Sequence, residues 1–314
     1  MTHLDFGLLI HPTPRGGTLA QMRETNERLL AVATAHDLSA WVIDHFQFAD
    51  APILECLAFL AYHAGQHPGL RWGTLVLGQG YRNPALTAKI GASLQFLTGG
   101  KFILGIGAGW KEDEYCAYGY PYPPACERIA QLAEAVAIIR AMWGDEGPVS
   151  YSGEHFRVSD AYCEPRPQPA PTLMIGGGGE RRTLRVVAEH ADWWNADYYT
   201  PDDYGRKLDV LHAHCREVGR DVDAITPTYF AGVSLSYDPE RLVRHPPFSY
   251  RPNMTVLHGT PDEVTAQLEQ FAALGVRHAQ LNFLDFPRTE GLDLFVNEVL
   301  PRFAPHTGAQ AKRV

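Results

Sequence analysis

The chain has 314 residues, and its 36 acidic residues against 27 lysines and arginines give a formal charge of −9 at pH 7. This acidic balance argues against a nucleic-acid partner and against an anionic membrane surface. Hydrophobic residues make up 45% of the chain and charged residues 20%, so it can build a sizeable core, and disorder is excluded for most of its length.

The cysteines and the N-terminus indicate the compartment. The five cysteines include no C-x-x-C pair, which disfavours a disulfide framework or a zinc knuckle and favours a reducing cytoplasm. The N-terminus carries no basic leader, and no apolar run approaches the ~20 residues that a membrane helix needs. We therefore expect a soluble, cytoplasmic protein without membrane contact.

Short apolar runs alternate with stretches of helical period along the chain. The expected strands are Leu4 to Ile10, Ala40 to His45, Trp72 to Gly78, Phe102 to Gly107, Thr172 to Gly176, Trp193 to Ala196, Thr228 to Leu235 and Ala279 to Leu284. The expected helices are Leu19 to His36, Pro52 to Gly65, Pro84 to Leu97, Glu127 to Trp143, Arg181 to His190, Pro201 to Val218, Pro261 to Leu274 and Gly291 to Arg302. This alternation is typical of a (β/α)8 TIM barrel, with a doubly wound open sheet as the runner-up.

Several boundaries carry their own signals. Thr260 with Glu263 forms a capping box, and Asn83 precedes Pro84 as a helix cap. Residues 147–171 break the rhythm with a hairpin-like alternation and a proline-rich run, so we expect an insertion there. The polar tail at 305–314 is expected to fray. The whole chain, 1–314, is then expected to form a single barrel domain.

In such a barrel the reactive groups lie where strands end. Asp44, His45 and Phe46 close the second expected strand, and an imidazole there can act as an acid or a base; a histidine that only caps the rim is the alternative. A glycine turn with Gly107 and Gly109 ends the fourth strand and permits close backbone approach to a flat or phosphorylated ligand.

The strongest anion signal is the run of four glycines, 176–179, at a strand-to-helix junction. Backbone N–H groups at a helix N-terminus, with Arg181 and Arg182 beside them, predict a phosphate cradle, and a merely flexible loop is the alternative. After the third strand, Arg82 can hold an anionic substituent or a partner carboxylate across the mouth; structural use of Arg82 stays equally open.

Two groups of residues could suggest a metal site, but neither has the position that a metal site needs. His212 and His214 resemble an H-x-H metal motif, but residues two apart on a helix point to nearly opposite sides, so both are assigned to the surface. The acidic run 112–114 is expected to favour a helix dipole and to face water. We expect no metal.

Ordered stretches over most of the chain resemble the luciferase-like flavin-dependent oxidoreductases, in particular their deazaflavin (coenzyme F420)-dependent branch. The matching stretches are Asp44-His45-Phe46, Gly73 to Val76, Tyr81 to Leu86, Leu104 to Trp110, Glu114-Tyr115 through Tyr118-Gly119, Ile175 to Gly179, Ala191 to Asn195, and Gly259 to Val264. The resemblance implies a (β/α)8 barrel with the ring across its C-terminal mouth and the cofactor phosphate on the glycine cradle.

The resemblance also implies roles for residues. His45 would stabilise or protonate the developing anion, and Asp44 would orient or charge its imidazole. The implied cofactor-binding residues are Leu75, Val76, Gly107, Gly109, Gly176, Gly177, Gly178, Gly179, Arg181 and Arg182, with a non-proline cis peptide between Leu75 and Val76. The implied substrate pocket is His11, Phe46, Tyr81, Arg82 and Trp110. Trp110 stands where the sugar-phosphate dehydrogenases of this plan have a glutamate, which argues against that activity.

The expected function is coenzyme F420-dependent hydride transfer to or from a small organic substrate. An FMN-dependent monooxygenase is the first alternative, because FMN also allows oxygen chemistry. A flavin-binding protein without turnover is the second, although His45 and Arg82 are both present. A barrel hydrolase would need clustered metal ligands or a nucleophile at strand ends, and none is found. A homodimer is compatible with these expectations.

Overall fold

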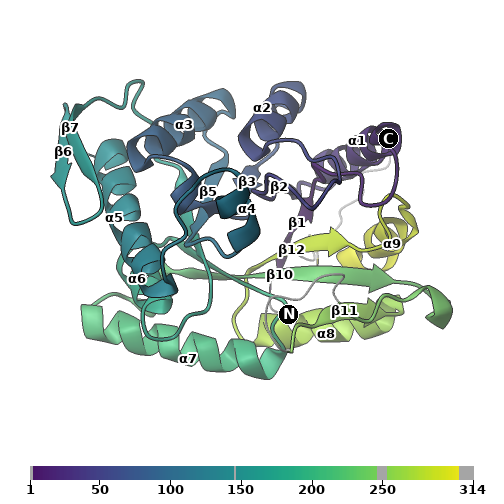
Figure 1. Ribbon diagram of the computed structural model, residues 1–314. Helices are drawn as coiled ribbons and strands as arrows, with labels where there is room; N and C mark the ends of the chain where they lie inside the picture. The colour runs from purple at the N-terminus through teal and green to yellow at the C-terminus, as the bar shows by residue number, and fades with distance from the viewer. Residues whose placement is uncertain (1–2, 145, 246–252, 304–314) are drawn as a thin grey trace, which may run out of the picture.

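The computed structural model describes residues 3–144, 146–245 and 253–303, and eight parallel strands in these ranges close into a barrel (Figure 1). The barrel strands are β1 (Asp5–Leu9), β2 (Ser39–Val42), β3 (Trp72–Thr74), β5 (Phe102–Gly107), β8 (Thr172–Gly176), β9 (Trp193–Asp197), β10 (Thr226–Leu235) and β12 (His278–Phe283). Closure follows from two pairings, because β12 pairs with β1 and β9 pairs with β10. The (β/α)8 prediction is therefore confirmed, and the open sheet is excluded.

Helices surround the barrel, as Figure 1 shows, and bury their apolar faces against the outside of the strands. They are α1 (Leu19–Ala35), α2 (Cys56–Gln66), α3 (Pro84–Leu97), α5 (Ala125–Gly144), α6 (Thr183–His190), α7 (Pro201–Val218), α8 (Pro261–Ala273) and α9 (Glu290–Leu294). The predicted caps are present: Thr260 and Glu263 form the capping box of α8, and the Asn83 side chain accepts from the Ala85 N–H.

One large side chain fills part of the barrel interior. Trp41 on β2 is fully buried, and its indole Nε1 donates to Ser39 Oγ at 2.7 Å. A Cβ atom on Gly7 would lie 2.2 Å from the Trp41 ring, and one on Gly73 would lie 2.3 Å from it. The two neighbouring strands therefore need glycine at these positions, because the indole occupies the space of their side chains.

The structure also differs from the sequence-based expectations. The third strand is interrupted by a cis peptide between Leu75 and Val76, as predicted, and resumes as β4 (Leu77–Gly78). The helix expected from Pro52 begins at Cys56, where Glu55 caps it. The last helix changes to a π-helical turn after Leu294. Strand β11 (Val256–Gly259) was not predicted, whereas helix α4 (Glu112–Ala117) begins at the acidic run that was expected to favour a helix dipole.

The insertion is confirmed as an antiparallel hairpin of β6 (Val149–Ser152) and β7 (Arg157–Ala161), which lies beside α5 at the edge of Figure 1. The predicted frayed tail, 305–314, lies outside the described residues. Across the described ranges, no helix is long and apolar enough to cross a membrane.

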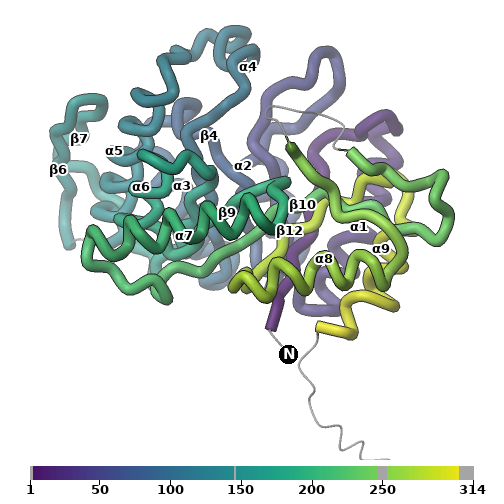
Figure 2. Tube along the Cα trace, turned by 90° about the horizontal axis from the view of Figure 1, so that it is seen from below, coloured from purple at the N-terminus to yellow at the C-terminus, as the bar shows by residue number. Residues whose placement is uncertain are grey.

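All barrel strands are parallel, so their carboxyl ends share one rim, and the loops that follow them form the mouth. Figure 2 shows α4 at one end of the barrel and the N-terminus at the other. Because β1 starts at the N-terminal end, α4 covers the carboxyl-terminal rim. This short helix thus brings residues of the loop after β5 over the loop that follows β2.

Candidate functional site

A partly buried histidine–glutamate pair lies at the barrel mouth. His45, in the loop after β2, donates from Nδ1 to Glu114 of α4, at 3.0 Å to Oε2. The His45 side chain is 15% exposed and the Glu114 side chain is completely buried. Because Nδ1 is held by Glu114, the opposite ring nitrogen, Nε2, is the atom that can meet a ligand.

Glu114 is held by several donors. It accepts hydrogen bonds from the backbone N–H groups of Phe46 and Gln47, both at 3.2 Å, and from the Tyr81 hydroxyl at 2.9 Å. Burial opposes ionisation of this carboxyl, but the donors, His45 first among them, hold its pKa below the ordinary glutamate value. Burial and the nearby Glu114 charge raise the pKa of Tyr81, so its phenol stays a proton donor.

The prediction that Asp44 orients the His45 imidazole is wrong. Asp44 instead accepts two hydrogen bonds from the Arg82 guanidinium, at 2.8 and 2.9 Å, and one from the Gly78 N–H at 2.9 Å. Arg82 also pairs with Glu55 at 2.6 Å. Arg82 therefore holds a partner carboxylate, one of its two predicted uses, and the Asp44–Arg82 pair fixes the loop that carries His45.

The acidic run 112–114 was predicted to face water, and for Glu114 that prediction is wrong. Its side chain points inward because α4 lies over the loop after β2, where unpaired backbone N–H groups need an acceptor. The sequence gives no local signal for this contact, since 69 residues separate Glu114 from His45.

Aromatic rings surround the pair. His45 lies 5.6 Å from the Trp110 ring, edge to face, and 4.8 Å from the Phe48 ring. Trp110 is 44% exposed and so remains available as a wall of the mouth. Tyr81, in contrast, is buried with its ring centre 4.4 Å from that of Phe46, and its place in the substrate pocket stays a prediction.

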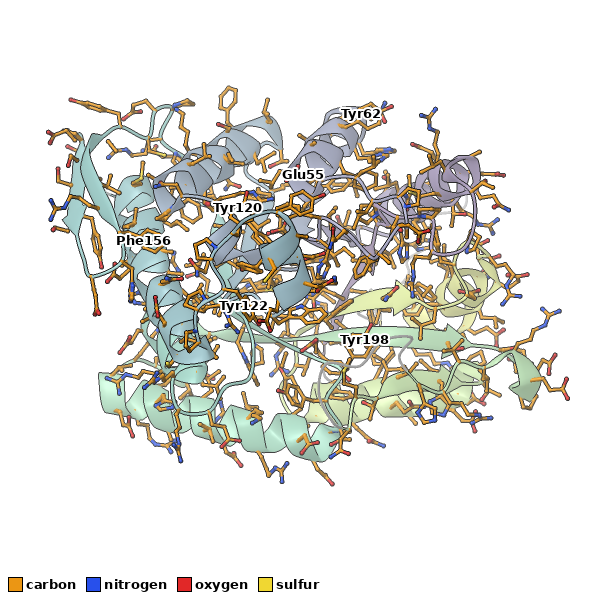
Figure 3. The ribbon with its side chains drawn as sticks, in the orientation of Figure 1. Glu55, Tyr62, Tyr120, Tyr122, Phe156 and Tyr198 are labelled. Carbon is orange, nitrogen blue, oxygen red and sulfur yellow. The ribbon has the colours of Figure 1, made fainter. Side chains whose placement is uncertain are left out.

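Further tyrosines extend this wall. Tyr120 and Tyr122 follow α4 and lie beside it in Figure 3, where Tyr198 lies toward β10. The Tyr122 hydroxyl donates to the Trp110 carbonyl at 2.8 Å, which fixes the backbone at the exposed indole. These two tyrosines were not predicted as site residues.

Val76 forms an apolar surface between two barrel strands. A Cβ atom on either Gly107 or Gly176 would lie 3.0 Å from Val76 Cγ2, so glycine is needed for Val76 to fit between β5 and β8. Gly109, predicted to approach a ligand, has φ +77, and a Cβ there would lie 2.1 Å from the Tyr115 hydroxyl. Glycine at this position leaves room for Tyr115, and the approach of Gly109 to a ligand stays a prediction.

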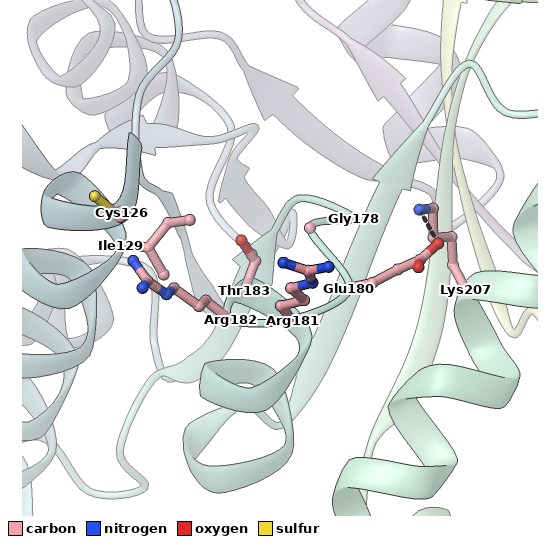
Figure 4. A pocket seen from close by; sticks show the side chains of 9 residues that line it. Cys126, Ile129, Gly178, Glu180, Arg181, Arg182, Thr183 and Lys207 are labelled. Atoms are coloured by element: carbon pink, nitrogen blue, oxygen red, sulfur yellow. Dashed lines mark hydrogen bonds and ion pairs between the residues drawn. The ribbon is translucent and has the colours of Figure 1, made fainter. Parts of the chain in front are cut away.

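The glycine run 176–179 borders an open pocket of about 640 Å³ (Figure 4). The pocket is lined by Cys126, Ile129, Gly178, Gly179, Glu180, Arg181, Arg182, Thr183 and Lys207. Gly177 has φ +123, and its N–H donates to the Asn195 carbonyl, so this N–H is not available to a ligand. The structure thus brings Gly178, Gly179 and the two predicted arginines together.

The electrostatics of this pocket are only partly balanced. Arg181 and Arg182 are exposed, and no hydrogen bond or ion pair is found for either side chain within the described part of the chain. Helix α6 begins at Thr183 rather than Arg181, and no side chain caps it. Lys207 of α7, not predicted, pairs with Glu180 at 2.6 Å. An anion can therefore find positive charge and uncapped N–H groups here.

Histidine 214 supports the same loop. Its Nε2 lies 2.7 Å from the Glu180 carbonyl oxygen, and the side chain is only 17% exposed. The side chain is thus partly covered, and it faces the glycine loop rather than a metal. The contact joins α7 to the residue that precedes Arg181.

A second polar group lies at the ends of β1 and β12. Arg15 donates to Asn282 at 2.8 Å, and Asn282 donates to the Tyr198 hydroxyl at 3.3 Å. Burial, and then the charge of Arg15, hold the pKa of His11 well below its usual value. His11 is only 1% exposed and packs on Phe286, and its place in the substrate pocket stays a prediction.

Comparisons with known proteins agree with this arrangement. A family model described as luciferase-like monooxygenase matches residues 5–255. The chain is 26% identical, over 84% of its length and 89% of the relative's, to the F420-dependent glucose-6-phosphate dehydrogenase of Amycolatopsis mediterranei (strain U-32). It is 36% identical over 58% of its length to the phthiodiolone/phenolphthiodiolone dimycocerosates ketoreductase of Mycobacterium kansasii, and that match spans 49% of the ketoreductase.

Among solved structures, the fold is similar to that of an F420-dependent secondary alcohol dehydrogenase in complex with an F420-acetone adduct. The TM-score is 0.80 at 18% identity, and the match covers 97% of this chain and all of the other. At this identity the likeness shows the fold alone.

Proposed function

The chain belongs to the luciferase-like monooxygenase family, and we propose that it is a coenzyme F420-dependent oxidoreductase that transfers a hydride to or from a small organic substrate. The observation that carries the proposal is the His45–Glu114 pair, held on the rim of the barrel and flanked by an exposed indole. A ketoreductase and an F420-dependent dehydrogenase among the similar proteins favour a carbonyl compound or the corresponding alcohol as substrate.

The residues present fit a ring with a phosphate-bearing tail. Val76 offers a flat apolar surface only because Gly107 and Gly176 leave room for it. Gly178, Gly179 and the two arginines leave positive charge and backbone donors for an anion. When bound, a deazaflavin supplies or accepts a hydride and reacts poorly with oxygen.

The side chains at the barrel mouth can supply a proton to the substrate. Anionic Glu114 accepts a hydrogen bond from Nδ1 of His45 and fixes the orientation of the imidazole. Nε2 can then give a proton to a carbonyl oxygen as the carbonyl carbon gains a hydride, and can take the proton back in the reverse direction. Asp44 acts indirectly, because its ion pair with Arg82 positions the loop that carries His45.

The same wall argues against a sugar phosphate as substrate. Trp110 presents an exposed indole at the position where polar contacts to such a substrate are expected. An apolar or aromatic carbonyl compound suits this wall better. We place the reaction in a reducing compartment such as the cytoplasm, which agrees with the five free cysteines.

The proposal is tested by paired titrations of the protein with coenzyme F420 and with FMN, followed by quenching of its intrinsic fluorescence. We expect F420 to bind at micromolar concentration and FMN at least about 10-fold more weakly, a difference of about 1.4 kcal/mol. Micromolar FMN binding without detectable F420 binding would replace the proposal by the FMN-dependent monooxygenase. Tight binding of F420 without turnover of any carbonyl or alcohol would favour the binding protein.

A further inference from the structure

A histidine on α2, the histidine that ends this helix and a glutamate on α1 converge outside the barrel mouth. His63 lies on the last turn of α2, and His67 is the C-cap residue four positions later. His63 Nδ1 lies 4.0 Å from Glu27 Oε1, and His67 Nε2 lies 3.5 Å from Glu27 Oε2. All three ligand atoms lie within 4.8 Å of one another.

The two ring nitrogens that face Glu27 have no satisfied hydrogen bond. Nδ1 of His63 and Nε2 of His67 are both buried, and neither has a hydrogen-bond partner among the described residues. His63 as a whole is only 4% exposed. A buried polar atom without a partner costs stability, so such atoms commonly mark a missing ion or water.

We propose that Glu27, His63 and His67 bind one divalent transition metal ion of the zinc type, which joins α1 to α2. Two imidazoles with one carboxylate are a ligand set that zinc accepts. Bonds of 2.0–2.2 Å at tetrahedral angles separate ligand atoms by about 3.4 Å, and the Glu27 oxygens lie 3.5 and 4.0 Å from the two ring nitrogens. The sequence did not single out this group, because its third ligand comes from another helix.

The surroundings leave a path for the ion and a fourth position. An open pocket of about 600 Å³, lined by Leu19, Ala20, Arg23, Glu24 and Glu27, reaches the carboxylate from solvent. The Glu27 side chain is 48% exposed, so water can complete the coordination. Phe59 packs its ring 4.5 Å from that of His63 and shields the inner side. Arg23 lines the same pocket, so its positive charge opposes a bound cation.

The site is structural rather than catalytic in position. Helix α2 returns from the carboxyl end of β2 to the start of β3, so its last turn lies toward the barrel end opposite the mouth. In Figure 3, Tyr62, the neighbour of His63, lies on the outer side of the ring of helices, away from Tyr122 and Tyr198. A metal there stabilises the fold and leaves hydride transfer unchanged.

The proposal is tested by titrating the full chain with Co²⁺, whose absorption reports coordination number and ligand type. We expect one tetrahedral Co²⁺ per chain, displaced by Zn²⁺, and a rise in Tm of about 4 °C at a Zn²⁺ concentration 100 times the Kd. Glu27→Gln and His67→Ala should each lower affinity by more than about 10-fold. Arg23→Gln should raise it.

His36→Ala is the matched control, because it removes an exposed histidine at the end of α1 while its capping N–H remains. It should bind Co²⁺ as the parent does. Near-ultraviolet charge transfer from thiolate would instead assign the metal to exposed Cys116 or Cys126 and overturn the proposal. Equal affinity in Glu27→Gln, His67→Ala and the parent would also overturn it, with circular dichroism showing that the variants are folded.

Discussion

The two halves of the barrel mouth differ in how far their polar groups are satisfied within the protein. Near His45, the buried carboxylate of Glu114 is satisfied within the protein, because it accepts from a histidine, a tyrosine and two backbone N–H groups. Around the glycine run 176–179, exposed arginines and an uncapped helix start are left without partners in the described structure. Under the proposed function, the first region is fixed before a ligand arrives, whereas the second would be completed by one.

This contrast assigns chemistry and binding to different places. A group that moves a proton must hold its geometry, and hydrogen bonds inside a low-dielectric site provide that. A group that binds an anion gains most if its donors are unsatisfied beforehand. Substitutions on the His45 side should therefore change stability or rate, and substitutions on the glycine side should change affinity.

The largest effect is expected for Glu114→Ala. The change leaves two backbone N–H groups, the Tyr81 hydroxyl and His45 without their buried acceptor, which typically costs about 3–5 kcal/mol. For a chain of this length we expect Tm to fall by about 5–8 °C in a thermal melt. Glu112→Ala, on the exposed face of the same helix, should shift Tm by less than about 1 °C. Equal shifts in both variants would refute the buried network.

The next effect concerns rate rather than stability. His45→Ala should lower the single-turnover hydride-transfer rate by about 10²-fold, because proton donation from Nε2 is lost, while cofactor affinity changes little. The rate and Tm are measured on the same preparation. A variant with a normal rate and reduced Tm would assign His45 to capping the rim, and His36→Ala serves as the neutral control.

A smaller effect is expected at the glycine side. Arg181→Ala or Arg182→Ala should each weaken F420 binding by about 10-fold or less, because the side chains are exposed and screened by salt. The dependence of Kd on ionic strength should also become shallower. Arg206→Ala, an exposed arginine of α7 outside the pocket lining, supplies the comparison. Unchanged affinity for F420 in both test variants would show that the anion site lies elsewhere.

The smallest effect is a pH dependence of stability. The pKa of Glu114 is lowered in the folded protein, so its ionised form stabilises the fold above the ordinary glutamate value of 4.5, and this stabilisation is lost as the pH falls below it. The Tm difference between the parent and Glu114→Gln should be constant from pH 8 to about pH 5 and narrow at about pH 4. A difference that widens in acid would contradict the assigned direction.

The sequence predicted the local elements and caps and missed the contacts between residues that are distant in the chain. Strands, most helices and the caps at Thr260 and Asn83 follow from periodicity and neighbouring residues, and the structure contains them. The partners of His45 and of the glycine loop come from α4 and α7, which are distant in sequence. Asp44 was taken for the partner of His45 because it is adjacent, yet adjacent side chains need not face each other.

The central claim is hydride transfer by a deazaflavin at the His45 rim. It is tested most directly by mixing the protein with reduced coenzyme F420 and a panel of ketones and aldehydes in the absence of oxygen. The account predicts that at least one carbonyl compound restores the absorption of the oxidised cofactor at a rate that depends on His45. Turnover seen only with reduced FMN and molecular oxygen would contradict it.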